Sequence, residues 1–396
     1  MHALEKILAK GAGKSEISAG QIVTAKVDLA EVNDLYLQVI KSFNEMQGDN
    51  VWNPDKVSFV FDHYSPAPTM KAAENHKKMR EFCQTQGIKK LFDINEGICH
   101  QVLPEAGYIY PGMILVATDS HTTTHGAFGA FATGVGATDL ATVLLSGELW
   151  FKVPEIIKIK IEGDLKEGVM AKDIILRILG ELGQSAAVYK AIEFTGPVVE
   201  KLPLDERLVL CNMTVEMGAK TSYIQPDKMT LEYLKSRVKG DFTVQETDRN
   251  YKYYAKYQYD VSDLTPLVAR PHSIDNIDKV KNIEDIPVDQ VFIGTCTGGR
   301  VNDIKVAAEI LSGKTIADRV RLIVIPASRE VYQIALEKGY IDTLIKSGAT
   351  ISTPGCGPCL GAHQGVLASE EVCVTTSSRN FPGRMGSTKA EIYSAS

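Results

Sequence analysis

Short apolar runs followed by polar residues recur along the chain and predict buried strands. Residues 57–61 (Val-Ser-Phe-Val-Phe) and 113–117 (Met-Ile-Leu-Val-Ala) are two such runs, and residues 291–293 and 320–325 are two more. Before the first run we expect helical and polar segments, with apolar periodicity around residues 32–40. Strand and turn signals occur in every third of the chain, which is typical of an α/β protein.

The pattern changes at residues 153–154. Residues 156–161 alternate like a half-exposed strand, and residues 171–182 have the period of an amphipathic helix. Residues 235–285 are charged and rich in tyrosine, and we expect a partly exposed helix and loop there. A helix after residue 302 then joins two predicted strands into a third α/β unit. We therefore predict three α/β domains, at residues 1–152, 153–286 and 287–396.

Composition narrows the class of protein. The chain has 396 residues, 44% of them hydrophobic and 23% charged, as in soluble proteins with more than one domain. A net charge of −6 without a basic stripe argues against a nucleic acid or a membrane surface as partner. The sequence has no signal-peptide pattern, and its seven cysteines form no secreted disulfide framework. We expect a cytoplasmic protein with reduced cysteines.

Two Gly-rich loops near the C-terminus contain three of the cysteines. Residues 354–361 read Pro-Gly-Cys-Gly-Pro-Cys-Leu-Gly, and residues 294–300 read Gly-Thr-Cys-Thr-Gly-Gly-Arg. Glycine permits the sharp turns and the close backbone approach that a bulky inorganic cluster requires. We interpret the loops as one site, in which Cys296, Cys356 and Cys359 hold an iron–sulfur cluster and leave one metal corner without a protein sulfur.

Three other interpretations of these cysteines stay open. Structural zinc needs four Cys or His ligands, usually in two pairs, and the chain has a single Cys-x-x-Cys pair. The segment from Cys356 to Cys359 is also a thioredoxin-type Cys-Gly-Pro-Cys dithiol, although no Trp precedes it. Buried structural cysteines are the third alternative.

Acidic and histidine residues follow two of the predicted strands. Asp62-His63 comes directly after residues 57–61, and Asp119-Ser120-His121 follows residues 113–117. Catalytic groups of open α/β sheets gather at the carboxyl ends of strands. Each pair is therefore a candidate general acid with its orienting carboxylate, although a single histidine in such a place is more often structural.

Three further features are candidates for a site. Asn212 and Glu216 are four residues apart and share a face if the segment is helical; alone, such a pair more often faces solvent. Arg379 and Arg384 lie in a Gly/Pro loop and suit forked recognition of carboxylates. Residues 126–137 are rich in Gly but lack the nucleotide-binding fingerprints, so we expect tight packing around a buried site.

These residues together describe a site for a polycarboxylate with a hydroxyl leaving group. Iron in such a site acts as a Lewis acid on the hydroxyl, while a histidine delivers a proton to it. The predicted reaction class is that of a hydro-lyase.

The motifs resemble those of the aconitase superfamily, in particular large subunits of the isopropylmalate isomerase, homoaconitase and dimethylmalate dehydratase type, over essentially the whole chain. The matching motifs are Asp62-His63, His100-Gln101, Asp119-Ser120-His121-Thr122, Cys211-Asn212-Met213 with Glu216, Gly294-Thr295-Cys296-Thr297, Pro354-Gly355-Cys356-Gly357-Pro358-Cys359, and Arg379-Asn380-Phe381 with Gly383-Arg384. The resemblance implies a three-domain α/β/α arrangement around a central cluster cleft, without the C-terminal swivel domain of aconitases.

The resemblance also implies a role for each residue. Cys296, Cys356 and Cys359 would ligate one [4Fe-4S] cluster per subunit, whose fourth iron lacks a protein ligand and binds substrate. His63 with Asp62 would protonate the departing hydroxyl. The residues expected to order the iron-bound water or hydroxyl are His100, Asp119, His121, Asn212 and Glu216. The residues expected to bind substrate are Gln38, Ser120, Arg379 and Arg384.

A separate small subunit, equivalent to the swivel domain, would supply a catalytic Ser and an Arg. The expected function is the large subunit of a hydro-lyase for an alkyl-substituted malate, either 3-isopropylmalate or 2,3-dimethylmalate. Homoaconitase is one alternative, and a thiol-disulfide redox protein using Cys356 and Cys359 is another. An RNA-binding iron sensor is disfavoured by the acidic balance. The chain departs from the family pattern at Tyr36, Gly298 and Ser378, and Gln38 stands where split isomerases often have Pro.

Overall fold

The structure is a computed structural model that describes residues 1–283 and 285–396. Its first unit contains a five-stranded parallel sheet of order β4-β3-β2-β5-β6. The strands are β2 (Leu29–Asn33), β3 (Val57–Val60), β4 (Lys90–Phe92), β5 (Ile114–Ala117) and β6 (Phe131–Gly134). β2, β3 and β5 are buried throughout, as expected for a parallel sheet covered on both faces.

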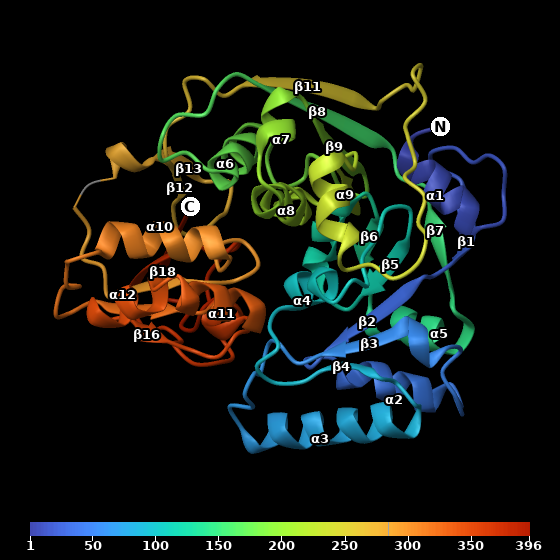
Figure 1. The fold of residues 1–396 in the computed structure, drawn as a ribbon, viewed down its shortest axis with the longest axis horizontal. Helices are drawn as coiled ribbons and strands as arrows, with labels where there is room; N and C mark the ends of the chain where they lie inside the picture. Colours follow the sequence, from blue (N-terminus) through green and yellow to red (C-terminus); the bar gives the residue numbers. More distant parts are fainter. Residues whose placement is uncertain (284) are drawn as a thin grey trace.

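Helices cover both faces of this sheet. They are α1 (Ala3–Gly11), α2 (Leu37–Glu45), α3 (Met70–Thr85), α4 (Cys99–Glu105) and α5 (Ala137–Ser146), with 3₁₀ segments η1 (Pro54–Lys56) and η2 (Ser120–Phe128). α2 and α3 lie on one side of the sheet and α4 on the other (Figure 1). β1 (Ile22–Lys26) and β7 (Glu148–Lys152) form a separate antiparallel ribbon.

The strands predicted at residues 57–61 and 113–117 are confirmed by β3 and β5. The periodic segment predicted at residues 32–40 is instead divided, because β2 ends at Asn33 and α2 begins at Leu37. A short window across that junction contains the buried end of a strand and the apolar face of a helix, which together imitate one period.

The second unit is a four-stranded parallel sheet of order β10-β9-β8-β11. Its strands are β8 (Ile156–Glu162), β9 (Ala191–Thr195), β10 (Thr221–Tyr223) and β11 (Ala255–Asp260), and its helices are α6 (Ala171–Leu182), α7 (Pro197–Lys201), α8 (Leu204–Asn212) and α9 (Lys228–Lys235), with η3 (Met213–Met217). α6 and β8 confirm the sequence prediction. β11 corrects it: this tyrosine-rich segment is an exposed edge strand that pairs, within residues 1–283 and 285–396, with β8 alone, and it therefore lacks an apolar run.

The third unit is built on a seven-stranded mixed sheet of order β13-β12-β18-β17-β14-β15-β16. Its strands are β12 (Leu267–Ala269), β13 (Ile277–Lys279), β14 (Gln290–Ile293), β15 (Arg321–Val324), β16 (Thr350–Ile351), β17 (Val372–Thr375) and β18 (Glu391–Ala395). Its helices are α10 (Val301–Leu311), α11 (Arg329–Glu337) and α12 (Tyr340–Lys346), with η4 (Val280–Asn282) and η5 (Gly357–Leu360). The unit expected around residues 291–325 is confirmed, and β12 and β13 join its sheet although they precede residue 287.

The three units meet at the carboxyl ends of β3 and β5. The 3₁₀ segment η2, directly after β5, packs between the first sheet and α8 of the second unit. Loops after β14, β16 and β17 of the third unit approach the first unit there. Arg300 donates to Gln101 at 2.9 Å, Cys356 N to Asp62 O at 2.8 Å, and Arg379 to Ser120 at 3.1 Å. Among the described residues, the helices are too short or too polar to cross a membrane.

Candidate active site

The two Asp/His pairs predicted separately from the sequence form one network. His63 Nδ1 lies 2.7 Å from Asp62 Oδ1, and His63 Nε2 lies 3.4 Å from Asp119 Oδ2. The other oxygen of Asp119 lies 3.1 Å from His100 Nε2 and accepts from the His121 backbone N–H at 2.6 Å. β2 lies between β3 and β5 in the sheet, so both strand ends open at the same edge.

The end of β2 contributes two residues that sequence reasoning missed as site residues. Asn33 Nδ2 donates to Asp62 Oδ1 at 3.1 Å and thereby orients the carboxylate that holds His63. Asp34 accepts from the His63 backbone N–H at 3.1 Å and lies 3.0 Å from His76 Nε2. Their signal was available, because Asn-Asp follows a buried strand just as Asp62 and Asp119 do.

A second layer of the network comes from the second and third units. His121 Nε2 lies 2.9 Å from Glu216 Oε1 and 3.0 Å from Ser378 Oγ. Arg379 Nε donates to both oxygens of Glu216 at 2.8 and 3.1 Å, and its Nη2 donates to Ser120 Oγ at 3.1 Å. The network therefore links residues from all three units.

Asn212 and Glu216 point into the protein, which corrects the preference for solvent. Asn212 ends α8 and is fully buried, with Nδ2 donating to Thr124 Oγ1 at 2.8 Å. Glu216 lies in the following 3₁₀ segment, and 8% of its side chain is exposed. A polar pair at the end of an apolar helix looks solvent-facing in sequence because its partners are contributed by distant segments.

Pairing, rather than burial, sets the charge of the site. Burial raises the pKa of Asp119, but the charges and hydrogen bonds of His100, His121 and His63 outweigh it and hold that pKa well below its usual value. The pKa of Glu216 is lowered in the same way, against burial, by His121 and Arg379. Burial lowers the pKa of His63, but Cys356 and Asp62 outweigh it, so the His63 pKa is raised and the protonated form is favoured.

The three cysteines of the Gly-rich loops are free and surround the same network. Burial raises the pKa of Cys296 to about 12 and also raises that of Cys356, and the negative charge of Cys359 adds to both shifts. Cys356 Sγ lies within 4.8 Å of ligand atoms of Asp62 and His63. Buried thiols with raised pKa values lose their protons readily only when a cation binds them.

The cysteine loops require their glycines. A Cβ at Gly355, which has φ +155°, would lie 2.7 Å from Asp62 O, and a Cβ at Gly298 would lie 2.2 Å from Thr376 Cβ. Thr376 thus fills the space that a side chain at position 298 would need. Thr295 adopts φ +72°, which is rare for a β-branched residue, immediately before Cys296.

These residues fit an iron–sulfur cluster held by three cysteines. The buried Nε of Arg384, a donor, lacks a hydrogen-bond partner among the described residues. Arg384 Nη2 lies 3.4 Å from Cys359 Sγ, and Asn212 lowers the pKa of Cys296 through a side-chain hydrogen bond. Donors directed at thiolate sulfur and a backbone that comes close to it suit a bulky anionic cluster.

A cavity of about 440 Å³ opens onto this network. Its lining includes His63, Asp119, Ser120, His121, Arg379 and Arg384, together with Leu35, Tyr36, Val135, Val215, Lys220 and Leu360. Lys220, which sequence reasoning missed, donates to Gly134 O at 3.2 Å. Gln38 does not line the cavity; it is exposed, and its amide donates to Ser42 Oγ at 3.2 Å.

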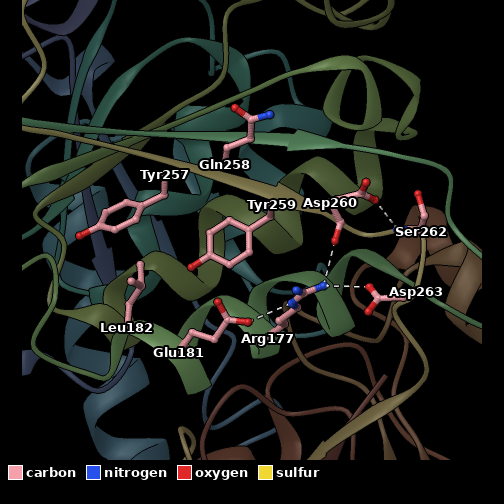
Figure 2. Close-up of a pocket in the computed structure, with 9 residues that line it drawn as sticks. All are labelled: Arg177, Glu181, Leu182, Tyr257, Gln258, Tyr259, Asp260, Ser262 and Asp263. Atoms are coloured by element: carbon pink, nitrogen blue, oxygen red, sulfur yellow. Dashed lines mark hydrogen bonds and ion pairs between the residues drawn. The ribbon is translucent and has the colours of Figure 1, made fainter.

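A second cavity, of about 590 Å³, is larger but differs in chemistry. It lies against β11 and α6, and its lining residues are shown in Figure 2. Its one arginine, Arg177, is already bonded to Glu181 at 3.0 Å, to the Asp260 carbonyl at 2.9 Å and to Asp263 at 3.4 Å (Figure 2). Because its charges pair with one another at the surface, we place the candidate active site in the first cavity.

The fold and the site thus define an α/β protein that combines three cysteine thiols with a histidine–carboxylate network. Such a combination is typical of a cluster-dependent dehydratase. Comparison with known families agrees: the aconitase family (aconitate hydratase) matches residues 5–281 and 275–396. The chain belongs to the aconitase family, and the expected hydro-lyase class is confirmed. That family implies an iron–sulfur cluster.

Individual relatives are similar over nearly their whole length. The chain is 52% identical to 3-isopropylmalate dehydratase large subunit 1 of Methanopyrus kandleri, over 99% of this chain and 94% of that protein. It is 47% identical to the probable methanogen homoaconitase large subunit of Methanothermobacter thermautotrophicus, over 100% of this chain and 94% of that protein. The crystal structure of Thermococcus kodakaraensis aconitase X (holo-form) has a TM-score of 0.54 at 15% identity, covers 96% of this chain and 90% of that one, and confirms the aconitase-like fold.

Proposed function

We propose that this chain is the cluster-bearing large subunit of a hydro-lyase that removes water from, or adds it to, an alkyl-substituted malate of the 3-isopropylmalate or 2,3-dimethylmalate type. The observation that carries the proposal is that the cysteine loops reach the His63–Asp119 network beside the cavity. Cys356 Sγ lies within 4.8 Å of ligand atoms of Asp62 and His63, and Leu360, next to Cys359, lines the cavity. The apolar lining by Leu35 and Val215, among others, supports an alkyl group on the substrate.

In this proposal the three cysteines hold a [4Fe-4S] cluster with one iron free of protein ligands. When bound, the cluster supplies a Lewis-acidic iron that draws charge from the substrate hydroxyl. Asn212 and Arg384 direct donors toward the thiolates, which limits the negative charge that the loops must hold.

His63 serves as the general acid. Asp62 fixes its Nδ1, and the raised pKa keeps the ring protonated, so Nε2–H points toward Asp119 and the cavity and can be delivered to the departing hydroxyl oxygen. His100 orients Asp119, and Glu216 orients His121, through hydrogen bonds. Together these residues hold the leaving oxygen in place. Arg379 and Ser120 with Arg384 bind the substrate carboxylates.

A small partner subunit completes the site. The curated relatives are named large subunits, which supports a heteromeric enzyme. We propose that the partner closes the cavity and supplies a Ser as the base that removes the carbon-bound proton and an Arg for a carboxylate. The seven free cysteines agree with a reduced, cytoplasmic location, which is part of the same proposal.

Homoaconitase is the second candidate, and two observations favour it. Relatives with that name are 47 and 48% identical to this chain. Lys220 lines the cavity and uses one donor on a backbone carbonyl, so its amine could take the additional carboxylate of a tricarboxylate.

The test is an anaerobic purification of the chain with its small subunit, followed by assay of alkene absorbance with 3-isopropylmalate, 2,3-dimethylmalate and homocitrate. Turnover of an alkylmalate supports the first proposal, and turnover of homocitrate alone supports the second. Iron and sulfide are counted on the same sample. An iron-free protein in which Cys356 and Cys359 form a reducible disulfide would overturn both and favour a redox dithiol.

The ligand assignment has its own test in the iron content. Cys359→Ser should lose iron and activity, because a serine is a poor ligand for a cluster that has only three protein sulfurs. Cys83→Ser is the matched control, because Cys83 is equally buried but lies in α3, in the core of the first unit. Equal iron in the two variants would remove Cys359 from the ligand set.

A further inference from the structure

Lys172 is a fully buried lysine at the start of α6, in the second unit, with 2% of its surface exposed. Its ammonium group reaches the third unit, where it donates to the carbonyl oxygens of Thr376 at 2.6 Å and Ser377 at 2.8 Å. Burying an ammonium group costs free energy, which two short hydrogen bonds from the charged donor offset here. The same bonds hold the backbone at residues 376–377 in place.

The segment that Lys172 holds leads directly into the active site. The next residue, Ser378, lies 3.0 Å from His121 Nε2, and Arg379 donates to Glu216 at 2.8 Å. Displacing the carbonyls at 376 and 377 would therefore move both side chains relative to the cavity.

The same segment is tied to the first cysteine loop. Thr376 Oγ1 accepts from Gly294 N at 3.0 Å and donates to Gly294 O at 2.9 Å. Thr297 Oγ1 donates to Thr376 O at 2.7 Å, sharing that acceptor with Lys172. One ammonium group thus supports both the substrate-facing arginine and the loop that carries Cys296.

The charges around Lys172 are negative. Burial lowers the pKa of Lys172 to about 7, and Asp303, Asp173, Cys296 and Cys359 oppose this shift. Because Lys172 and Thr297 donate to the same carbonyl, this ammonium group lies beside the loop that carries Cys296.

We propose that Lys172 is a positioning residue of this active site: its amine fixes the 376–377 backbone, so that Ser378 meets His121 and Arg379 faces the cavity, and it places a positive charge beside the cysteine loops. The proposal rests on the proposed function only for the identity of the substrate and the cluster. Lys172 touches neither and acts through the backbone and through its charge.

The test compares Lys172→Met, which removes donor and charge, with Lys172→Gln, which keeps a donor and removes the charge. In the complex with the small subunit, Lys172→Met should raise KM about tenfold and leave kcat within about threefold, because Arg379 is displaced in ground and transition states alike. Lys172→Gln should raise KM less. The midpoint potential of the cluster, followed by absorbance on the large subunit, should fall in both variants, since each loses a cation beside the thiolates.

Lys90→Met is the matched control. Lys90 also donates to a backbone carbonyl, that of Asp55, and burial also lowers its pKa, but it lies on β4 and does not line the active-site cavity. It should leave KM and potential unchanged.

The outcomes separate the two proposals. Wild-type KM and potential in a folded Lys172→Met protein would overturn the role of Lys172, and if that variant fails to fold, unchanged values in Lys172→Gln would do the same. A wild-type enzyme that turns over none of the hydroxy acids would overturn the proposed function, while the potential would still test the charge of Lys172.

Discussion

Two groups of buried acids lie near the cysteine loops, and their pKa values are shifted in opposite directions. Around the cavity, Asp34, Asp119 and Glu216 all have lowered pKa values. A second group, the Arg300 cluster (Asp205, Glu206 and Asp303), surrounds the arginine that donates to the Cys296 carbonyl at 2.7 Å. In that cluster burial raises the pKa of Glu206 to about 7 and that of Asp303 to about 6. Burial also raises the pKa of Glu105, which accepts from Gln101 at 2.7 Å, to about 7.

The difference lies in the number of cationic partners. Asp119 contacts three histidines, and Glu216 contacts His121 and Arg379. The acids of the Arg300 cluster share one guanidinium, whose closest approach to Asp205 is 4.0 Å and which donates instead to Gln101 at 2.9 Å. Burial alone therefore raises the pKa of an acid toward neutral pH, and only cationic partners keep a buried acid fully ionised.

His63→Ala should have the largest effect. Loss of the general acid should lower kcat by about 10³-fold. Iron content and cluster absorbance should be retained, because His63 is not among the proposed ligands. The measurement pairs turnover with iron analysis on one sample, and a colourless variant would contradict the separation of proton donor from cluster ligand.

Asp119→Asn should lower kcat by about 10²-fold, because the amide cannot accept from three histidines or balance their charge. Asp205→Asn is the matched change in the Arg300 cluster and should alter kcat less than about twofold, since Asp205 lies outside the cavity and burial already favours its neutral form. Equal losses in the two variants would break the comparison.

Arg384→Lys should raise KM for the substrate about tenfold with a smaller change in kcat, because an ammonium group cannot reproduce the planar fork of the guanidinium. Lys also loses the contact to Cys359 Sγ at 3.4 Å. An unchanged KM in steady-state assays would remove Arg384 from the residues that bind substrate.

Glu105→Gln should affect stability rather than activity, and only at higher pH. The folded-state pKa of about 7 lies above the ordinary value of 4.5 for a glutamate. The folded protein therefore binds an extra proton between these values and loses stability as pH rises through them. Gln removes this penalty and should stabilise the protein by about 1–3 kcal/mol at pH 8 and by little at pH 4.5. Urea unfolding at the two pH values measures the difference.

Glu216→Gln is the opposite case and sharpens the comparison. The lowered pKa of Glu216 means that its contribution to stability is present above its unfolded pKa and is lost as pH falls through the folded value. The substitution should therefore destabilise the protein at pH 7, where Glu105→Gln stabilises it. The same sign for both variants would contradict the assignment of charge.

Local sequence contained enough to predict the buried strands, α6 and the candidate chemistry at their ends. Apolar runs such as residues 57–61 fix a strand because both faces must be covered, and the polar residue after such a run stands at the edge of the sheet. The same rule would have selected Asn33 and Asp34. It failed at β11, whose edge position leaves no apolar signature.

The sequence by itself thus determined the α/β class, the cysteine loops and the residue types of a dehydratase. Only the tertiary structure decided which acids are ionised, that Asn212 and Glu216 face inward, that Lys220 lines the cavity and Gln38 does not, and that Lys172 supports the 376–377 backbone. The physical reason is that strand and helix formation follow from neighbours along the chain, whereas charge state and side-chain direction depend on partners that are distant along the chain.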